Sequence, residues 1–237
     1  IGGTVGDIEG QPYLEAIRQM RKDVGRDNVL YIHVTLLPHL SASGELKTKP
    51  TQHSVRELRG MGIQPDIIIC RTEADLDEDN RKKIAMFCNV ERKNVVAFRD
   101  VAHTIYECPL DLRRDKIDRL VVDKIGLGHT PSPALEDWER FVQRVIHPKH
   151  KVSIAVAGKY IELQDAYKSI YESLIHAGAH HDTKVRIVRV DTEAIEDHGA
   201  KSVIGEVDGI LVPGGFGDRG TEGKILAAQY ARENKIP

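Results

Sequence analysis

The sequence lacks a long apolar run, a block of basic residues and a secretory signal. The 237 residues carry a formal net charge of -2, so nothing in the overall charge favours binding to nucleic acid. No apolar run approaches the roughly 18 residues that a membrane-spanning helix needs, and the first residues show no signal-peptide pattern. We therefore expect a cytoplasmic protein with neither a nucleic-acid nor a membrane partner.

Cysteines are few and form no recognisable pattern. Cys70, Cys88 and Cys108 show neither a disulfide framework nor metal-ligand spacing. Their apolar neighbours indicate buried thiols, and none lies in a Gly-x-Cys-x-Gly elbow, so we expect all three to be structural. The histidines also lack metal-ligand spacing, and no Walker A loop occurs. The cysteines and histidines therefore predict no catalytic nucleophile and no metal site.

Apolar and amphipathic runs alternate along most of the chain. The near-continuous apolar run at 29–37 is typical of a strand in a parallel sheet covered on both faces. Strands that alternate with helices indicate βαβ units, so we expect an α/β protein with parallel sheets. The predicted strands are 29–37, 67–70, 95–98, 152–157, 185–190 and 210–212. A first predicted helix begins at Pro12, and the later predicted helices are 52–61, 80–87, 116–125, 135–146, 165–179 and 221–233.

A short charged stretch around Pro148 interrupts this pattern. Because the alternation restarts at Val152, we expect a first unit at 1–146, a linker at 147–150 and a second unit at 151–237. The first unit begins inside a glycine-rich motif and the second stops in mid-pattern. We therefore expect both units to be incomplete and the chain to be an excerpt of a longer one.

A polar stretch at 41–54 joins the strand at 29–37 to the following helix. Ligands of open α/β sheets bind at this end of the strands. Lys47 and Lys49 supply two cations, Pro50 stiffens the backbone, and free N–H groups at the helix N-terminus favour an anion. Further hydrogen-bonding groups come from Thr48, Thr51, Gln52 and His53. The stretch suits a polyphosphate, and a solvated polar loop is the alternative.

Three further groups of residues suit a ligand. Asp7 and Glu9, in a glycine-rich segment, suit Mg²⁺ or a hydrogen-bond donor. Lys83 lies on the predicted helix at 80–87. Gly214 and Gly215 follow a predicted strand and would present N–H groups without a Cβ, as in an oxyanion hole. The alternatives are a pair of solvated carboxylates, a solvated helix face and a tight turn.

Four motifs then occur in a distinctive order. They are Gly-Gly-Thr-Val-Gly-Asp-Ile-Glu at 2–9, Lys-Thr-Lys-Pro-Thr-Gln-His-Ser at 47–54, Gly-Lys-Tyr-Ile-Glu-Leu at 158–163 with Asp-Ala-Tyr-Lys-Ser at 165–169, and Pro-Gly-Gly-Phe-Gly at 213–217. Together they resemble the CTP synthase family over essentially the whole chain. The resemblance implies a P-loop, dethiobiotin-synthetase-like synthetase domain followed by a flavodoxin-like class I glutamine amidotransferase domain.

This family makes CTP from UTP, ATP and ammonia, and the ammonia comes from glutamine. The resemblance therefore implies a ligase of de novo pyrimidine nucleotide biosynthesis that uses Mg²⁺ with ATP, is activated by GTP and forms a homo-oligomer, a tetramer in the full-length family. By resemblance, UTP or CTP would contact Asp7, Ile8, Glu9, Lys47, Thr48, Lys49, Pro50, Thr51, Gln52 and Lys83, ATP would contact Val101, and glutamine would contact Gly214 and Gly215.

The family's P-loop, metal-binding carboxylates and glutaminase cysteine are not in this sequence, so we expect residues 1–237 alone to be inactive. Two other functions stay open. One is a non-catalytic module that binds or senses pyrimidine nucleotides. The other is a P-loop relative of the dethiobiotin synthetase type with another substrate, against which the motif at 47–54 argues.

Overall fold

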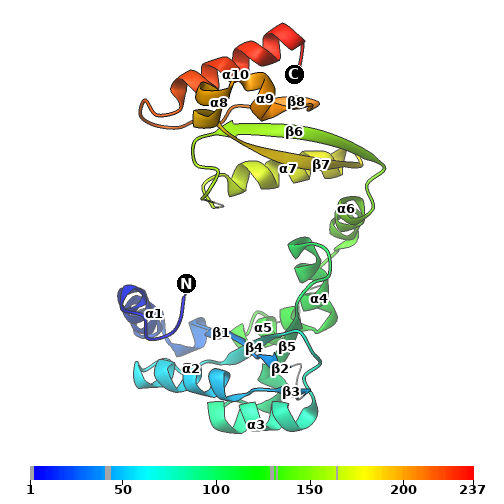
Figure 1. The fold of residues 1–237 in the computed structure, drawn as a ribbon. Coiled ribbons are helices and arrows are strands. Elements are labelled where there is room, and N and C mark those ends of the chain that lie inside the picture. Colours follow the sequence, from blue (N-terminus) through cyan, green and yellow to red (C-terminus); the bar gives the residue numbers. More distant parts are fainter. Residues whose placement is uncertain (1–2, 41–43, 129–130, 132, 164) are drawn as a thin grey trace. The chain divides into compact units, whose positions relative to one another are not determined.

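The computed structural model describes residues 3–40, 44–128, 131, 133–163 and 165–237. Its contacts divide the chain into two compact units, Ile1–Ala134 (unit 1) and Leu135–Pro237 (unit 2). Each unit contains a three-stranded parallel sheet (Figure 1), which confirms the predicted α/β class. Within the described residues, no helix is long and apolar enough to cross a membrane.

The sheet of unit 1 has the order β1-β4-β5, with β4 in the middle. Its register places Val34 beside Ile69 and Ile69 beside Val96. The strands are β1 (Ile32–Leu36), β4 (Ile67–Thr72) and β5 (Val95–Arg99), and the helices are α1 (Gln11–Val24), α2 (Lys49–Gly60), α3 (Glu78–Cys88), α4 (Cys108–Arg114) and α5 (Ile117–Ile125). Each of the three strands overlaps a predicted one.

The central strand β4 is buried on both faces, as its apolar sequence predicts. Ile68 packs with Val55 of α2 and Ile84 of α3 in one core cluster. Its neighbour Ile67 points to the opposite face and packs with Ile117 of α5. Each of these fully buried side chains stabilises the fold by about 1.5–3 kcal/mol. Helices therefore cover both faces of the sheet.

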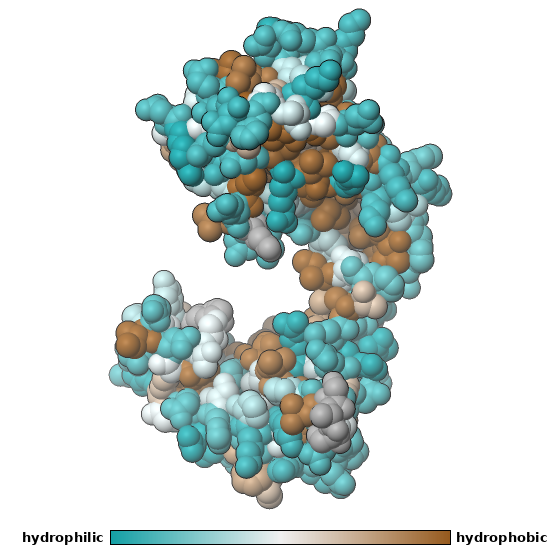
Figure 2. All heavy atoms as spheres, in the orientation of Figure 1, coloured by the Kyte–Doolittle hydropathy of each residue, from teal (hydrophilic) through white to brown (hydrophobic). Residues whose placement is uncertain are grey.

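The edge strand β1 is less well covered, and a small hairpin follows it. Ile32, Val34 and Leu36 share one face of β1 and are exposed, and Figure 2 shows apolar atoms at the surface of unit 1 between polar ones. The hairpin pairs β2 (His39–Leu40) with β3 (Glu45–Leu46) in antiparallel register. The sequence pattern predicted a loop here, because strands of two residues show no periodicity.

Unit 2 has the strand order β7-β6-β8, all parallel. This is the start of the flavodoxin-like order 2-1-3-4-5. Val156 packs with Tyr167 and Tyr171 on one face of the sheet, and Ala155 packs with Ile195 on the other. The elements are β6 (His150–Gly158), α7 (Lys168–His180), β7 (Thr183–Asp191), α8 (Thr192–His198), α9 (Ala200–Ile204), β8 (Gly209–Leu211) and α10 (Thr221–Asn234).

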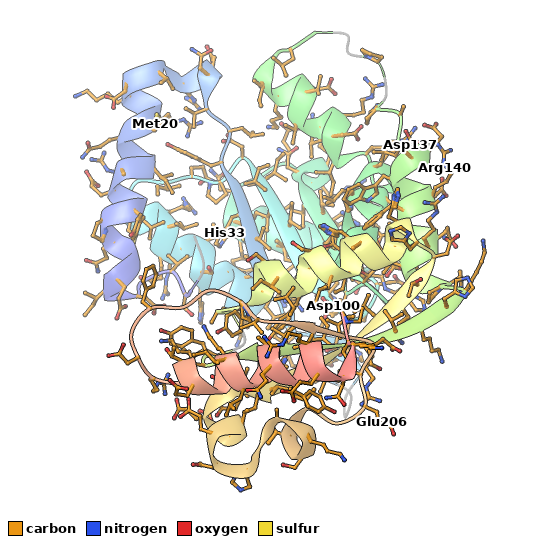
Figure 3. The ribbon with its side chains drawn as sticks, turned by 90° about the horizontal axis from the view of Figure 1, so that it is seen from above. Met20, His33, Asp100, Asp137, Arg140 and Glu206 are labelled. Carbon is orange, nitrogen blue, oxygen red and sulfur yellow. The ribbon has the colours of Figure 1, made fainter. Side chains whose placement is uncertain are left out.

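Helix α6 (Glu136–Ile146) packs on unit 2. Its Phe141 ring lies 5.7 Å from the ring of His176 on α7, and Arg144 forms an ion pair of 3.5 Å with Asp182. Figure 3 shows Asp137 and Arg140 together on this helix. The predicted boundary at 147–150 comes after α6, whereas the contacts divide the chain before it. These aromatic and ionic contacts are the physical reason.

The start of α10 lies very close to α8. A Cβ added to Gly223 would lie 1.9 Å from the backbone oxygen of Thr192, and the Gly223 N–H donates to Glu196 Oε1 at 2.9 Å. A Gly223→Ala substitution must therefore push the two helices apart. We expect it to lower the free energy of unfolding by about 1–3 kcal/mol, measured by chemical denaturation. Ala228→Ser, at an exposed position of the same helix, is the matched control, and equal stability of both variants would contradict this packing.

The cysteines give a second prediction. Cys70 and Cys88 are buried, and burial raises the pKa of each thiol to about 11. Cys108 is only half-buried, which corrects the expectation that all three are buried. Because the thiolate is the reactive form, native protein at pH 8 should react with a disulfide reagent first at Cys108 and much more slowly at the other two. Equal rates at all three would contradict the structure.

The raised pKa values of Cys70 and Cys88 also predict how the free energy of unfolding changes at alkaline pH. The unfolded thiols ionise near pH 9, whereas the folded ones stay protonated up to about pH 11. The folded state therefore binds more protons in this interval, and the free energy of unfolding should fall as the pH rises from about 9 to about 11. A Cys70→Ser, Cys88→Ser double variant should lose part of this pH dependence in denaturant titrations.

Candidate functional site

The polar stretch of unit 1 ends in the first turn of α2. This helix begins at Lys49, earlier than the predicted residue 52, because Pro50 suits the first turn of a helix. Thr48 is the N-cap residue, but its side chain makes no capping hydrogen bond. No side chain therefore caps the N–H groups of this first turn, those of Lys49 and Thr51, since Pro50 has none; uncapped N–H groups of this kind suit an anion. Residues 41–43 of the stretch lie outside the described residues.

Two threonines of this motif turn inward. Thr48 and Thr51 are 3% and 0% exposed. The hydroxyl of Thr51 lies 3.0 Å from that of Thr35 on β1, and Gln52 donates to the Thr48 hydroxyl at 3.0 Å. A further contact, 2.8 Å from His33 Nε2 to the hydroxyl of Ser54, joins the same two elements; Figure 3 shows His33 on β1. These side chains hold α2 against β1.

The lysines of the predicted site are partly or fully exposed, and one of them pairs with a carboxylate. Lys47 Nζ donates to Glu45 Oε2 at 2.8 Å, and this hydrogen bond is the main cause that lowers the pKa of Glu45. The charge of Lys83 on α3 also lowers it, which places Lys83 near the β2–β3 hairpin. Lys49 is exposed at the start of α2. Lys83 and Lys47 thus both act on Glu45, while the grouping of Lys83 with Lys49 stays a prediction.

Asp7 and Glu9 lie elsewhere in unit 1. Asp7 closes a turn, since its Oδ2 accepts from the Thr4 N–H at 2.8 Å, and Ile8 starts the short helix η1 (Ile8–Gly10). Asp7 and Glu9 line a cavity of about 680 Å³ together with Tyr13, Leu14, His33, Val34, Leu58 and other residues, none of them from 47–52. Figure 1 shows α1 and the β2–β3 hairpin on opposite sides of unit 1. Within one chain, Asp7 and Glu9 therefore do not lie in one site with the residues of the motif at 47–52.

Val101 lies at the carboxyl ends of β4 and β5, beside an ion pair that the sequence pattern did not single out. Arg71 donates to both oxygens of Asp100, at 2.6 Å and 3.3 Å, and the Asp100 N–H donates to the Thr72 oxygen at 3.1 Å. This pair lowers the pKa of Asp100. The sequence signal that could have indicated this ion pair was that Arg71 and Asp100 each follow an apolar run. Half-buried Val101 follows directly.

The segment 213–217 of unit 2, here called the glycine loop, follows β8 and is held by two lysines. Lys159 Nζ donates to the oxygens of Phe216 and Gly217, and Lys224 Nζ donates to the oxygen of Pro213 at 3.0 Å. A Cβ on Gly215 would lie 2.9 Å from Lys224 Nζ and 3.1 Å from Lys159 Cε. The missing Cβ at Gly215 therefore leaves room for both lysines.

Gly214 behaves differently from its neighbour. A Cβ on Gly214 would meet nothing within 4 Å, and this glycine is exposed. An exposed glycine without side-chain bulk suits an oxyanion-hole donor, which must present its N–H to a ligand. Lys159 belongs to the motif at 158–163 but was given no role, and Lys224 lies in none of the four motifs, because the two are far apart in the chain.

A metal site is not built from the described residues. Among them, no three or more histidine, cysteine or carboxylate side chains are grouped so that they could hold a metal ion. Asp7 and Glu9 therefore have no third ligand of this kind, and Mg²⁺ prefers an octahedral set of oxygen ligands.

Two protein families match the chain in succession. The family described as CTP synthase N-terminus matches residues 1–127, and the family described as glutamine amidotransferase class-I matches residues 162–237. Their order agrees with unit 1 followed by unit 2.

Several curated CTP synthases align with the whole chain. Those of Methanocaldococcus jannaschii and Desulfitobacterium hafniense are 57% and 56% identical to it, and that of Methanococcus aeolicus is 54% identical. In each case 100% of this chain is covered, but only 44–45% of the relative. The chain thus spans less than half the length of these relatives. The match of the synthetase family over more than half of the chain shows that it belongs to the CTP synthase family.

Proposed function

We propose that this chain is the central part of an enzyme that aminates UTP to CTP with ATP, using ammonia from glutamine. The observation that carries this proposal is the agreement of about 55% of residues with curated CTP synthases over the whole chain. In this proposal, 1–146 belongs to the synthetase domain, 147–150 is a linker and 151–237 belongs to the glutaminase domain. The packing of α6 on unit 2 favours an earlier start for the second of these domains.

The start of α2 supports a site for the triphosphate of UTP or CTP. A nucleoside triphosphate carries about four negative charges, which lysine ammonium groups and free helix N–H groups offset. Lys49 and the uncapped first turn of α2 supply both kinds of group, and Lys83 lies nearby. Thr48, Pro50, Thr51 and Gln52 shape this turn, with their side chains engaged by the protein or by the helix itself.

Asp7, Ile8 and Glu9 are proposed to contact the same nucleotide from another subunit. Within one chain they line a cavity away from the lysines, so a joint site needs a second copy of the protein. This requirement supports the proposed homo-oligomer, a tetramer in the full-length enzyme. The proposed cellular location is the cytoplasm.

The remaining ligands are assigned to the carboxyl ends of strands. ATP is proposed to contact Val101, beside the Arg71–Asp100 pair. Glutamine is proposed to contact the glycine loop, where the Gly214 and Gly215 N–H groups would stabilise the oxyanion of amide hydrolysis. Mg²⁺ with ATP and GTP as activator belong to the same proposal.

Nucleotide binding by the complete enzyme tests the lysine assignment. We expect Lys49→Ala or Lys83→Ala to weaken UTP binding about ten- to a hundred-fold, since a charge-assisted contact contributes about 1.5–3 kcal/mol. Lys47→Ala should weaken it less, because this lysine must first leave Glu45. Calorimetry measures the affinities. Lys82→Ala is the control, since Lys82 is also exposed on α3 but pairs with Asp79.

Normal UTP affinity in both the Lys49 and Lys83 variants would contradict the nucleotide site. Equal losses in the Lys82 and Lys83 variants would show a general charge effect instead. A complete protein that binds UTP but never forms CTP would favour the alternative, a non-catalytic pyrimidine-nucleotide-binding module.

The 237-residue chain should itself be inactive. Glutamine hydrolysis by a cysteine needs an activated thiolate. Cys70 and Cys88 are buried with a pKa of about 11, and burial also raises the pKa of Cys108. We expect neither glutamate from glutamine nor CTP from UTP, ATP, Mg²⁺ and ammonia in assays of the purified chain. Product formation well above a blank would contradict this prediction.

A further inference from the structure

Lysine Lys224 fixes one peptide group of the glycine loop from outside. It lies in the first turn of α10 and donates to the backbone oxygen of Pro213 across the loop. A trans peptide is planar, so its C=O and the following N–H point in opposite directions. Anchoring the Pro213 oxygen therefore also fixes the direction of the Gly214 N–H group, which points away from Lys224.

Lys159 holds the other end of the loop. This residue directly follows β6, is 7% exposed, and donates to the oxygens of Phe216 and Gly217. Its ammonium also lies 5.4 Å from the centre of the Tyr160 ring, which offsets part of the cost of burying a charge. The two lysines thus bind the loop on both sides of Gly214 and Gly215.

Neither lysine is neutralised by a carboxylate. In the part of the chain that the structure describes, every hydrogen bond from the two ammonium groups goes to a backbone oxygen. Two positive charges therefore lie beside a loop with two exposed glycines, Gly214 and Gly215, and backbone N–H groups of such a loop favour an anion. Gly215 lets both lysine side chains lie this close to the loop, because a Cβ at this position would collide with them.

We propose that Lys224 is a positioning residue for glutamine hydrolysis: it orients the Gly214 N–H toward the oxyanion, while Lys159 secures the loop downstream. This inference rests on the proposed glutaminase function of unit 2. Lys224 contacts the loop backbone rather than the reacting amide, so its removal should slow the chemical step more than it weakens glutamine binding.

The test uses the complete enzyme with three single variants. Lys224→Met keeps the apolar stem and removes the ammonium, Lys224→Arg restores a cation, and Lys201→Met on α9 is an exposed control in the same unit. We expect Lys224→Met to lower kcat for glutamine hydrolysis about ten-fold or more with little change in KM, less than the 10²–10³ lost with a direct oxyanion donor. Lys224→Arg should recover part of the rate, and Lys201→Met should match the unchanged enzyme.

Two further readouts separate positioning from general damage. CTP formation from added ammonia bypasses glutamine hydrolysis and should persist in Lys224→Met. The Gly214 amide resonance of the 237-residue chain should shift in Lys224→Met but not in Lys201→Met. An unchanged kcat, a rise in KM alone, or an unmoved Gly214 resonance would each overturn the proposal.

The proposed function fails in a different way. If the complete wild-type enzyme does not hydrolyse glutamine while the Gly214 resonance responds to Lys224→Met, the loop geometry stands. The catalytic role of Lys224 is then overturned together with the glutaminase assignment.

Discussion

Burial of one central strand on both faces determines where the functional groups of each unit meet. β4 in unit 1 and β6 in unit 2 each pair with two parallel neighbours, and parallel pairing puts the carboxyl ends of all three strands at one edge. The Arg71–Asp100 pair joins two such ends in unit 1. In unit 2, Lys159 after β6 reaches the glycine loop after β8. The Arg71–Asp100 pair and the contact of Lys159 with the glycine loop both depend on how the parallel strands are aligned.

Much of this architecture could be predicted from periodicity. The main strands and longer helices were found within a few residues, because each has its own apolar pattern. The β2–β3 hairpin and the short helices α4, α8 and α9 were missed, since so few residues carry no clear period. The first unit was expected to end after α6, because the charged stretch at 147–150 looks like a linker. Contacts across helices, such as Phe141 with His176, are invisible to local composition.

The site was predictable by residue type but not by side-chain direction. The motif at 47–54 correctly indicated cations at a helix N-terminus, yet Thr51 turns inward to meet Thr35. Thr51 was expected in a loop before residue 52, but it lies in the first turn of α2, on the buried side of that helix. The contacts of Lys224 and Lys159 with the glycine loop were missed for a related reason. Their function comes from contact with one loop, and only the folded chain makes that contact.

The packing of α6 also bears on how such a protein evolves. Phe141 and Arg144 contact α7 and the residue that precedes β7, so α6 shares its apolar and charged partners with unit 2. A gene rearrangement with its crossover at 147–150 would leave these partners behind and expose the face of α7 that they cover. A crossover upstream of Glu136 would transfer the helix with its sheet. Selection would therefore favour inheritance of α6 and the amidotransferase-like unit as a single module.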